Sequence, residues 1–209
     1  GIMAGKEIEL PVPKPVKGLR FAILKTVAME HVVDLPKKAF RNSIDKLEKA
    51  GARISEISVS SVNEAMDLTG FLYSPEAYAT WKHKIEKSPD LMFAKILERF
   101  RSGADVLASE FICAWDKLMD LRQQYHLEVE AYDAVLIPTS PIVPPEISRL
   151  MSNGDFYNSQ NLLALRNTRI GNLMGGCSIT LPTDIPSCGL LIMGRPNEEE
   201  RLLRLAQAC

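Results

Sequence analysis

The sequence predicts an α/β fold, because short apolar strands alternate with amphipathic helices along most of its 209 residues. Residues 19–59 place a strand, a helix and a second strand close together, which is typical of a βαβ unit with a parallel strand pair and a right-handed crossover. The C-terminal region continues this alternation with strands at 134–137, 178–181 and 189–193. A hydrophobic content of 46% is sufficient for a sizeable core.

The βαβ unit is bounded by recognisable start and stop signals. An apolar run at 19–24 predicts a buried strand, and an imperfectly alternating run at 52–59 predicts a second strand. Between them, Pro36 favours a helix start with Asp34 as the capping candidate, and Gly51 favours a helix end. The helix has apolar residues at helical spacing, namely Phe40, Ile44 and Leu47.

The middle of the chain predicts helices alone. Residues 61–72 and 75–87 are expected to form two helices that separate at Ser74-Pro75, since proline fits a new first turn. A short helix around 93–100 and the longest helix, 104–130, follow. The longest helix has an apolar stripe made of Leu107, Phe111, Ala114, Leu118, Leu121 and Tyr125. Such a stripe fits a coiled-coil seam, but in a globular chain core packing is more common.

The C-terminal region begins with the strand 134–137 and the proline cluster PTSPIVPP at 138–145. One or two helices are expected over 156–174, and a turn over 182–188 joins the last two strands. The final helix starts near Glu198, where the acidic run 198–200 complements the helix dipole.

The first 17 residues are expected to form an extended proline-rich connector, with 18–209 as the α/β part and a helical insert at about 61–130. The chain opens with Gly1 rather than Met, so we expect it to be a cut or truncated piece. No signal peptide pattern is present at its start.

Composition excludes several classes of function. With 25 basic and 26 acidic residues the net charge is −1, and no dense Lys/Arg run occurs, so we expect neither nucleic acid nor a membrane as a partner. Four cysteines without a C-x-x-C pair predict reduced, mostly buried thiols in a cytoplasmic protein, with no metal site. The oligomeric state stays open, with a homo-oligomer as one option.

Candidate catalytic groups are few. His31, His83 and His126 fall in or beside expected helices or a polar loop, where solvation or packing is the usual role. A Cys177–His126 pair stays open, although nothing near Cys177 marks an activated thiol. Basic residues near the ends of expected elements could hold a carboxylate or form surface ion pairs: Arg20, Lys25, Arg166 and Arg169. Gly175-Gly176 belongs to no phosphate-binding loop motif, and we expect no cofactor.

The loop 138–145 is the most informative segment. It follows an apolar strand directly, so its small hydroxyls lie at the carboxyl end of that strand. In open α/β sheets ligands bind at this edge, and prolines would keep the loop rigid.

Several motifs in order resemble the amidase-signature family. DAVLIPTSPIVPP resembles its D-x-L-x-P-T-x-P-x-x-A-P segment, with Pro145 as a local departure. RNTRIGNLMGGCSITLPTDIPSCGLLIMGRPNEEERLLRLAQAC resembles its closing region, and IMAG, the proline-rich linker and P-V-K-G-L-R resemble its middle. The resemblance implies the C-terminal part of an α/β/α fold, with a partial mixed sheet flanked by helices.

The resemblance also implies a function. Members hydrolyse amide bonds with a serine nucleophile, a second serine and a lysine, held in a segment of the type G-G-S-S-G-x-S. This sequence has no such segment, and the cluster Ser58, Ser60 and Ser61 lacks the glycines. We therefore assign no catalytic residue and expect the chain alone to be inactive. The residues that the resemblance brings to the substrate are Thr139, Ser140, Pro141, Asn172 and Gly176.

Three hypotheses follow from the sequence. The first is the C-terminal fragment of an amidase that cleaves a small-molecule amide; its variant is a fragment of the related, glutamine-dependent tRNA amidotransferase. The second is a non-catalytic α/β interaction module, because orphaned strand edges seek partners. The third is a thiol enzyme that uses Cys177.

Overall fold

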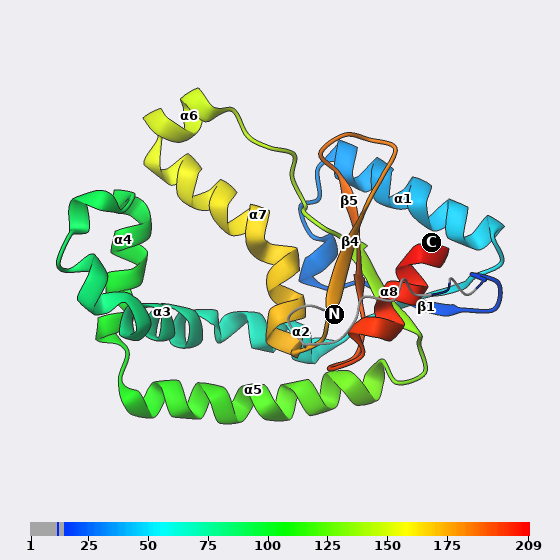
Figure 1. Cartoon of the computed structure of the whole chain (residues 1–209), viewed down its shortest axis with the longest axis horizontal. Helices are drawn as coiled ribbons and strands as arrows, with labels where there is room; N and C mark the ends of the chain where they lie inside the picture. Colours follow the sequence, from blue (N-terminus) through cyan, green and yellow to red (C-terminus); the bar gives the residue numbers. More distant parts are fainter. Residues whose placement is uncertain (1–11, 13–14) are drawn as a thin grey trace. The chain divides into compact units, whose positions relative to one another are not determined.

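The computed structural model describes residue 12 and residues 15–209, and Figure 1 shows their elements in chain order. The described chain divides into two compact units. The sheet unit contains the residues up to Val59 together with His126–Cys209, and the helical unit contains Ser60–Tyr125.

The sheet unit is built on one five-stranded mixed sheet with the strand order β2-β1-β3-β5-β4. β1 pairs in parallel with β2 and with β3, whereas β5 is antiparallel to both β3 and β4. The α/β class with a mixed sheet is therefore confirmed. The strands are β1 Arg20–Leu24, β2 Arg53–Ile57, β3 Ala134–Pro138, β4 Ser178–Pro182 and β5 Gly189–Met193.

Strand burial follows position in the sheet. All five residues of the central strand β3 are buried, and so are four of the five residues in β1 and in β5. The edge strands contain only exposed and half-buried residues, which alternate throughout β4 and in β2 up to Ser55. Continuous apolar runs therefore mark the inner strands and alternating runs mark the edges, as expected for strands covered on two faces and on one face.

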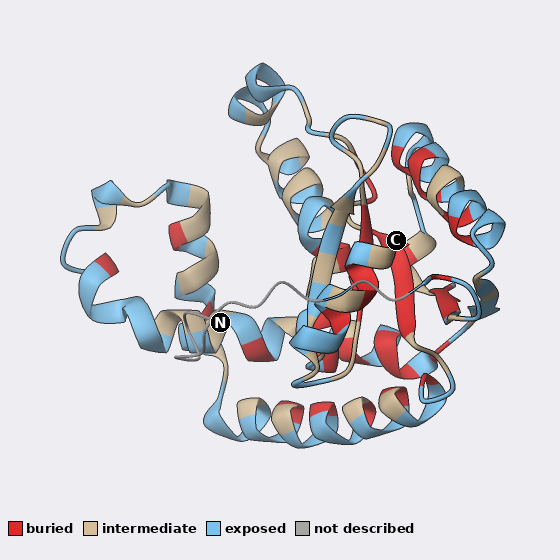
Figure 2. Cartoon of the chain, turned by 45° about the vertical axis from the view of Figure 1, so that its right-hand side comes forward, coloured by how far each residue is buried: buried red, intermediate tan, exposed pale blue. Residues whose placement is uncertain are grey.

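Helices cover both faces of the sheet. α1 (Asp34–Lys49) and α8 (Glu199–Ala208) pack on the face that carries Phe21, Leu136 and Ile192. α7 (Gly154–Met174) lies on the opposite face, where a Cβ on Gly171 would contact Ser178 and Met193. Figure 2 shows the buried residues concentrated in the strands and on the inner sides of these helices.

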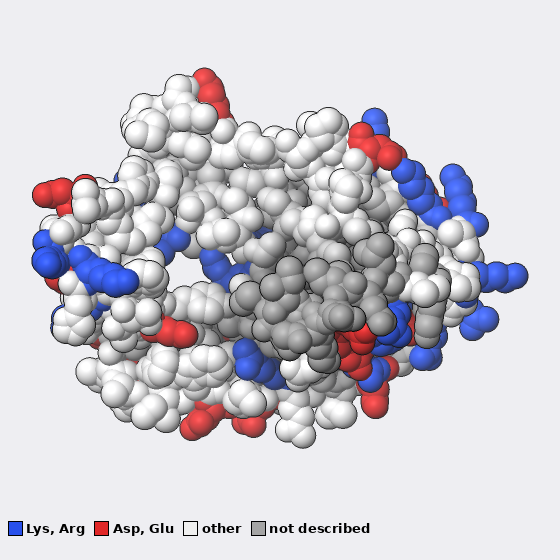
Figure 3. All heavy atoms as spheres, viewed as in Figure 1, with Lys and Arg blue, Asp and Glu red and all other residues white. Residues whose placement is uncertain are grey.

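The observed N-cap residue of α1 differs from the expected one. The helix begins at Asp34 itself, Val33 holds the N-cap position without a side-chain hydrogen bond, and Pro36 is the third helical residue. Asp34 therefore acts only as an acidic residue in the first turn, where its charge complements the dipole. The expected end is confirmed, because Gly51 follows the C-cap residue with φ of +94°. Basic side chains project into solvent around α1 in Figure 3.

The helical unit contains α2, α3, α4, most of α5 and two 3-10 turns. The expected break at Ser74-Pro75 is wrong, since α3 runs through Pro75 and the break lies at Leu68. The backbone of Gly103 packs against Ser74 and Pro75 so closely that a Cβ there would overlap the Ser74 carbonyl. Pro75 therefore lies at a close backbone contact between α3 and η4. The bounds are α2 Ser60–Asp67, α3 Thr69–Ile85, η3 Pro89–Leu91, α4 Ala94–Arg101, η4 Ser102–Asp105 and α5 Ala108–Glu128.

The long helix α5 is shorter than expected, and α7 has the same length of 21 residues. Residues 102–105 form the 3-10 turn η4, and Val106 is extended, so the helix cannot begin at 104. The stripe is buried from Ala114 to Tyr125 but not at Leu107, which precedes the helix and is exposed. The buried part of the stripe is therefore a packing face.

Two further expectations concern the thiols and the connector. The thiols are free, but they are not mostly buried: Cys113 and Cys209 are exposed, and Cys177 and Cys188 are half-buried. Cys113 lies beside the buried stripe of α5 rather than on it, and Cys209 is the last residue. The expected connector at 1–17 lies outside the described residues except at Val12 and residues 15–17.

The remaining elements follow the expected pattern. The helix expected over 156–174 is α7, which begins at Gly154 and is preceded by the short helix α6 (Ile147–Ser152). Asn153 caps α7, since its side-chain oxygen accepts a hydrogen bond from the Phe156 amide at 2.9 Å. The 3-10 turn η2 (Val27–Met29) follows β1 and lies against α7.

Candidate functional site

The loop after β3 places a hydroxyl pair at the carboxyl end of the sheet's central strand. Thr139 Oγ1 donates a hydrogen bond to Thr180 Oγ1 at 3.2 Å, and the Thr139 amide donates to the Gly189 carbonyl at 2.9 Å. A Cβ on Gly189 would come within 2.6 Å of the Thr180 methyl and 2.7 Å of Thr139 Oγ1. The absence of a side chain at Gly189 therefore gives the two threonines their positions.

The same loop is held rigidly. The Ser140 hydroxyl donates to the Ile142 carbonyl at 3.1 Å, which closes a local turn. The carbonyl of the buried Pro141 accepts a hydrogen bond from the Val33 amide at 2.9 Å. Of the loop residues expected at the substrate, Thr139 has a hydroxyl paired only with another hydroxyl, whereas Ser140 and Pro141 are used to shape the loop.

A buried polar cluster, Arg166 and Asn167 of α7, ties this loop to the loop after β1. Asn167 is fully buried, and its side-chain amide donates to the Pro138 carbonyl at 2.7 Å and to the Ala28 carbonyl at 3.0 Å. Arg166 donates to the Glu30 carbonyl at 2.7 Å and to the Asn167 side-chain oxygen at 3.1 Å. These bonds fix the carboxyl ends of β1 and β3 relative to one another.

The Arg166 guanidinium therefore has an internal role. Burial lowers its pKa, and the charge of Glu30 opposes that shift. An arginine remains protonated in proteins, so its donors need acceptors when they are buried. The Ala28 and Glu30 carbonyls supply them. Of the two options considered for Arg166, a carboxylate ligand and a surface ion pair, this buried geometry shows neither.

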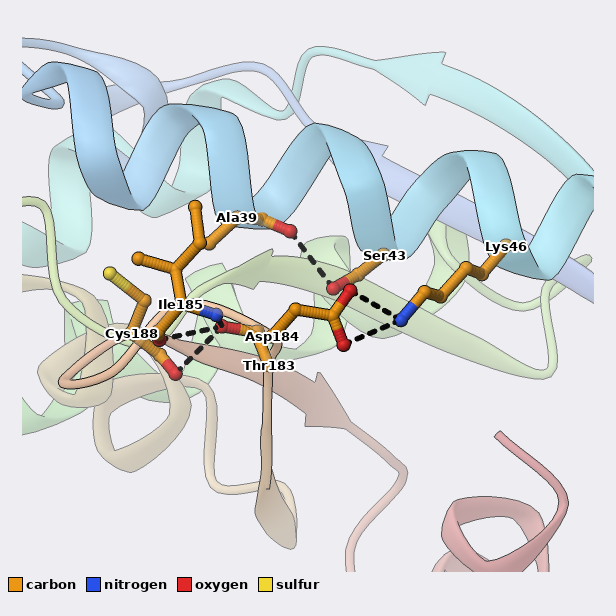
Figure 4. A network of polar contacts seen from close by, with 7 residues as sticks. All are labelled: Ala39, Ser43, Lys46, Thr183, Asp184, Ile185 and Cys188. Atoms are coloured by element: carbon orange, nitrogen blue, oxygen red, sulfur yellow. Dashed lines mark hydrogen bonds and ion pairs between the residues drawn. The ribbon is translucent and has the colours of Figure 1, made fainter.

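The turn between β4 and β5 borders the threonine pair. Figure 4 shows Thr183, the first residue of this turn, whose hydroxyl lies 3.1 Å from the carbonyl oxygens of both Ile185 and Cys188. Asp184 of the same turn forms an ion pair with Lys46 of α1 at 2.6 Å. The turn is therefore ordered internally and tied to α1 at its tip.

Asn172 and Gly176 lie towards the other end of the sheet. A Cβ on Gly176 would overlap the Gly194 carbonyl, and the residue before Gly194, Met193, pairs with Val135 at the start of β3. Thr139 is four residues beyond Val135, which corresponds to about 13 Å along the strand. Asn172 is exposed and lies about 7.5 Å further along α7 than Asn167. The structure does not bring these two residues together with Thr139.

Cys177 and His126 each contact a different backbone carbonyl rather than one another. Cys177 Sγ donates to the Arg195 carbonyl at 3.1 Å, while the His126 ring contacts the Met174 carbonyl at 3.0 Å. Burial, followed by the charge of Glu199, raises the pKa of the Cys177 thiol, which keeps it protonated and unreactive. His31 and His83 are exposed. The geometry therefore does not favour a Cys177–His126 pair.

Other groups considered from the sequence have ordinary structural roles. Lys25 forms an exposed ion pair with Glu56 at 2.9 Å, and the Ser58 hydroxyl donates to the Lys25 carbonyl at 3.2 Å. Arg20 is exposed, and its backbone amide donates to the Asp133 carboxylate at 2.8 Å. Arg169 is half-buried.

Neither a metal site nor a membrane span occurs in the part of the chain that the structure describes. Within residues 12 and 15–209, no three His, Cys, Asp or Glu side chains gather in a way that could hold a metal ion. None of the helices described in the structure has both the length and the apolarity needed to cross a bilayer.

Comparison with characterised sequences identifies relatives of the chain. It is 27% identical to 2-amino-5-chloromuconic acid deaminase of Comamonas testosteroni, over 94% of this chain and 44% of the relative. It is 26% identical to an amidase of Pseudomonas putida, over 99% and 48%, and to a subunit of the glutamyl-tRNA(Gln) amidotransferase of Geobacter metallireducens, over 99% and 49%. The chain thus spans about half the length of these relatives.

Solved structures agree on the fold. Allophanate hydrolase of Kluyveromyces lactis superposes with a TM-score of 0.78 and 17% identity, covering 97% of this chain and 34% of the hydrolase. The family model for amidases matches residues 3–203. Because that match extends over nearly the whole sequence, the chain belongs to the amidase family.

Proposed function

We propose that this chain supplies the C-terminal half of an amidase that hydrolyses the C–N bond of a small carboxamide. The observation that carries the proposal is the pair of threonine hydroxyls, Thr139 and Thr180, at the carboxyl end of the central strand in an amidase-family sheet. Ligands of open α/β sheets bind at this edge. The site needs neither a metal nor an organic cofactor, and we place the protein in the cytoplasm.

In this proposal the chain binds and orients the substrate but does not break the bond. Members of the family use a serine nucleophile, a second serine and a lysine in a Gly/Ser-rich segment, and this sequence contains no such segment. The described serines near β2 do not replace it: the Ser58 hydroxyl bonds a backbone carbonyl, and the Ser61 hydroxyl is buried with no bonded base. A nucleophile requires a base within hydrogen-bond reach.

The chemistry of the edge suits an uncharged group. A hydroxyl both donates and accepts, so a pair of hydroxyls can bond the carbonyl oxygen and the NH₂ group of a carboxamide. The nearby guanidinium of Arg166 is already bonded to backbone carbonyls. Because Asn167 and Pro141 fix the loop, the hydroxyls need little reorganisation when the substrate binds.

The organisation of the chain forms part of the proposal. We assign residues 18–209 to the amidase domain, residues 1–17 to a connector, and the helical segment at about 61–130 to an insert. The sheet of the whole protein would then be larger than the five strands of the described sheet, with β2 or β4 as the strand where it continues.

The test compares the 209-residue chain with a protein that also carries the Gly/Ser-rich segment. We expect the longer protein to hydrolyse propionamide and the chain alone to give only background ammonia release. Replacing Thr139 with valine in the longer protein should raise KM more than it lowers kcat. Turnover by the chain alone that disappears on mutation of one of its own residues would contradict the proposal that this chain binds the substrate without breaking the bond.

Membership of an amidotransferase is the second candidate function, favoured by the similarity to the glutamyl-tRNA(Gln) amidotransferase of Geobacter metallireducens. Such a protein would release ammonia from glutamine and pass it to a partner. Glutamine carries two charged groups that need charged anchors. At the described edge Arg166 is bonded to backbone carbonyls and Lys25 is paired with Glu56, which leaves neutral hydroxyls for a ligand. Comparing glutamine with propionamide in the longer protein separates the two functions: a preference for glutamine would favour the amidotransferase.

A non-catalytic interaction module is the remaining alternative, supported by the edge strands β2 and β4 of the described sheet. Unpaired strand edges associate with other chains. Size-exclusion chromatography of the chain distinguishes the readings. Oligomers, including a homo-oligomer, would support a half-domain with an uncovered strand edge, and a stable monomer would disfavour it.

A further inference from the structure

Thr26 has a buried hydroxyl with no hydrogen-bond partner. Among the described residues only Thr26 Oγ1 and Ser61 Oγ are side-chain oxygens of this kind, and Ser61 belongs to the helical unit. Thr26 follows β1 and holds the N-cap position of η2, yet its side chain does not cap that turn. A buried polar group in a native protein is normally bonded, so its exceptions call for an explanation.

The strand register places Thr26 beside Thr139. β1 and β3 are parallel, with Phe21 opposite Ala134 and Ile23 opposite Leu136. Continuing that register by three residues beyond the last paired positions, Ile23 and Leu136, brings Thr26 opposite Thr139. The two residues therefore lie at the same edge on neighbouring strands.

The two threonines also share a face of the sheet. Phe21 and Ile23 belong to the core under α1 and α8, so Ala22 and Leu24 point to the α7 face. Thr26 has extended φ and ψ of −133° and −154°, and alternation therefore directs it to the α7 face as well. By the same alternation Thr139 follows Val135 and Ile137 onto that face, where its hydroxyl meets Thr180.

Hydrogen bonds on both sides of Thr26 hold its segment in place, so a local rearrangement cannot easily give its hydroxyl a partner within the protein. Asn167 bonds the Ala28 carbonyl on one side and the Pro138 carbonyl on the other. The Val33 amide bonds the Pro141 carbonyl, which ties the same two loops together again. Thr26 is thus an unsatisfied hydroxyl in a segment that the fold holds in place.

We infer that Thr26 is a substrate-binding residue whose hydroxyl bonds the carboxamide group of the ligand, next to the Thr139–Thr180 pair. This inference rests on the proposed amidase function and specifies its substrate. Three neutral hydroxyls select an uncharged carboxamide over a carboxylate, since a buried carboxylate requires charged or multiple amide donors. The ligand supplies the partner that Thr26 lacks in the protein.

The experiment replaces Thr26 with valine, which keeps the shape and removes the hydroxyl, in the protein that also carries the Gly/Ser-rich segment. KM for propionamide should rise by about 5-fold to 10-fold, as expected for one lost hydrogen bond, with kcat changed less than about twofold. The thermal midpoint should stay unchanged or rise, because no internal bond is lost. Thr26→Ser should restore KM.

Thr168→Val is the matched control. The Thr168 hydroxyl donates to the Leu165 carbonyl within α7, so this variant loses an internal hydrogen bond. It should lower the thermal midpoint slightly and leave KM unchanged, the opposite of Thr26→Val. An unchanged KM in Thr26→Val overturns the inference. So does a lower midpoint in Thr26→Val that Thr26→Ser recovers, since the hydroxyl would then have a partner inside the protein.

Failure of the proposed function gives a different result. If the wild-type protein hydrolyses no carboxamide, the amidase proposal fails, and binding is then measured directly by NMR titration of the chain with propionamide. Weaker binding by Thr26→Val than by wild type would support the role of Thr26. Equal binding by both proteins, or no binding by the wild type, would overturn it.

Discussion

The two ends of the central strand β3 differ in how their polar groups are used. Before its first residue, the Asp133 carboxylate accepts hydrogen bonds from the Arg201 side chain and from the Arg20 amide. After its last residue lie the buried amide of Asn167 and the hydroxyls of Thr139 and Thr180, and the Arg166 guanidinium beside Asn167 is bonded to backbone carbonyls. At the first end the charges are paired within the protein, whereas at the second end a hydroxyl pair has bonding capacity left for a ligand.

The same contrast separates the site residues expected from the sequence. Thr139, Ser140 and Pro141 lie at the carboxyl end of β3, and Gly176 lies near its start. Gly176 is explained by a backbone contact with Gly194, with no reference to a ligand. We therefore propose that the substrate binds at the carboxyl end of β3, whereas Gly176 at the other end serves packing.

The largest effect is expected at Asn167. Replacing it with alanine removes the side-chain donor to the Pro138 carbonyl and leaves the Ala28 carbonyl with only the longer bond from Arg166 at 3.3 Å, in a buried site. We expect a loss of about 2 to 4 kcal/mol in the free energy of unfolding, measured by urea denaturation. Asn158→Ala is the control, because Asn158 lies on the exposed side of the same helix. Equal losses in both variants would show that the Asn167 bonds do not hold the loops together.

A smaller effect is expected at Gly176. In Gly176→Ala the added methyl group would overlap the Gly194 carbonyl, which is backbone and cannot rotate away. The cost should be about 1 to 3 kcal/mol in unfolding free energy, and KM of the longer protein should not change. Gly70→Ala is the control, because nothing lies within 4 Å of its Cβ position in α3 and alanine favours a helix. If KM rose in Gly176→Ala while the variant remained fully folded, the substrate would instead bind at this end of the sheet.

The smallest effect is expected at the turn between β4 and β5. Lys46→Met breaks the ion pair with Asp184, in which both side chains are about 60% exposed. An ion pair this exposed contributes roughly 0 to 1 kcal/mol, and salt screens it. Unfolding measured at low and at high salt should show a small difference between the variant and wild type that vanishes at high salt. A large difference that persists in salt would mean that the turn depends on this contact.

Much of the fold was accessible from the sequence. Buried strands appear as continuous apolar runs, so β1, β3 and β5 were predicted nearly to the residue. Pro75 was misleading because a proline usually interrupts a helix, whereas α3 continues through Pro75, where its backbone contacts Gly103. The start of α5 was misplaced for a similar reason, since 3-10 and α-helical turns have closely similar sequence patterns.

Less of the candidate site could be predicted from the sequence. Thr139 was predicted as a site residue because it follows an apolar strand directly, and its role in binding stays a prediction. Its hydrogen-bond partner Thr180 lies 41 residues away and is identified only through the β4–β5 pairing. Asn167 was missed because a single asparagine in a helix is usually exposed. A signal did exist: Asn167, Ile170 and Met174 have helical spacing, so the asparagine occupies a position on a buried apolar stripe.

The most direct test of the account maps where a small carboxamide binds on the ¹⁵N-labelled chain. Propionamide is titrated into the chain, and the amide chemical shifts of residues 26–28, 139–140, 180 and 189 are compared with those of residues 172–177. We predict saturable shifts in residues 26–28, 139–140, 180 and 189 and none in residues 172–177. Shifts confined to residues 172–177, with none around Thr26 and Thr139, would contradict it.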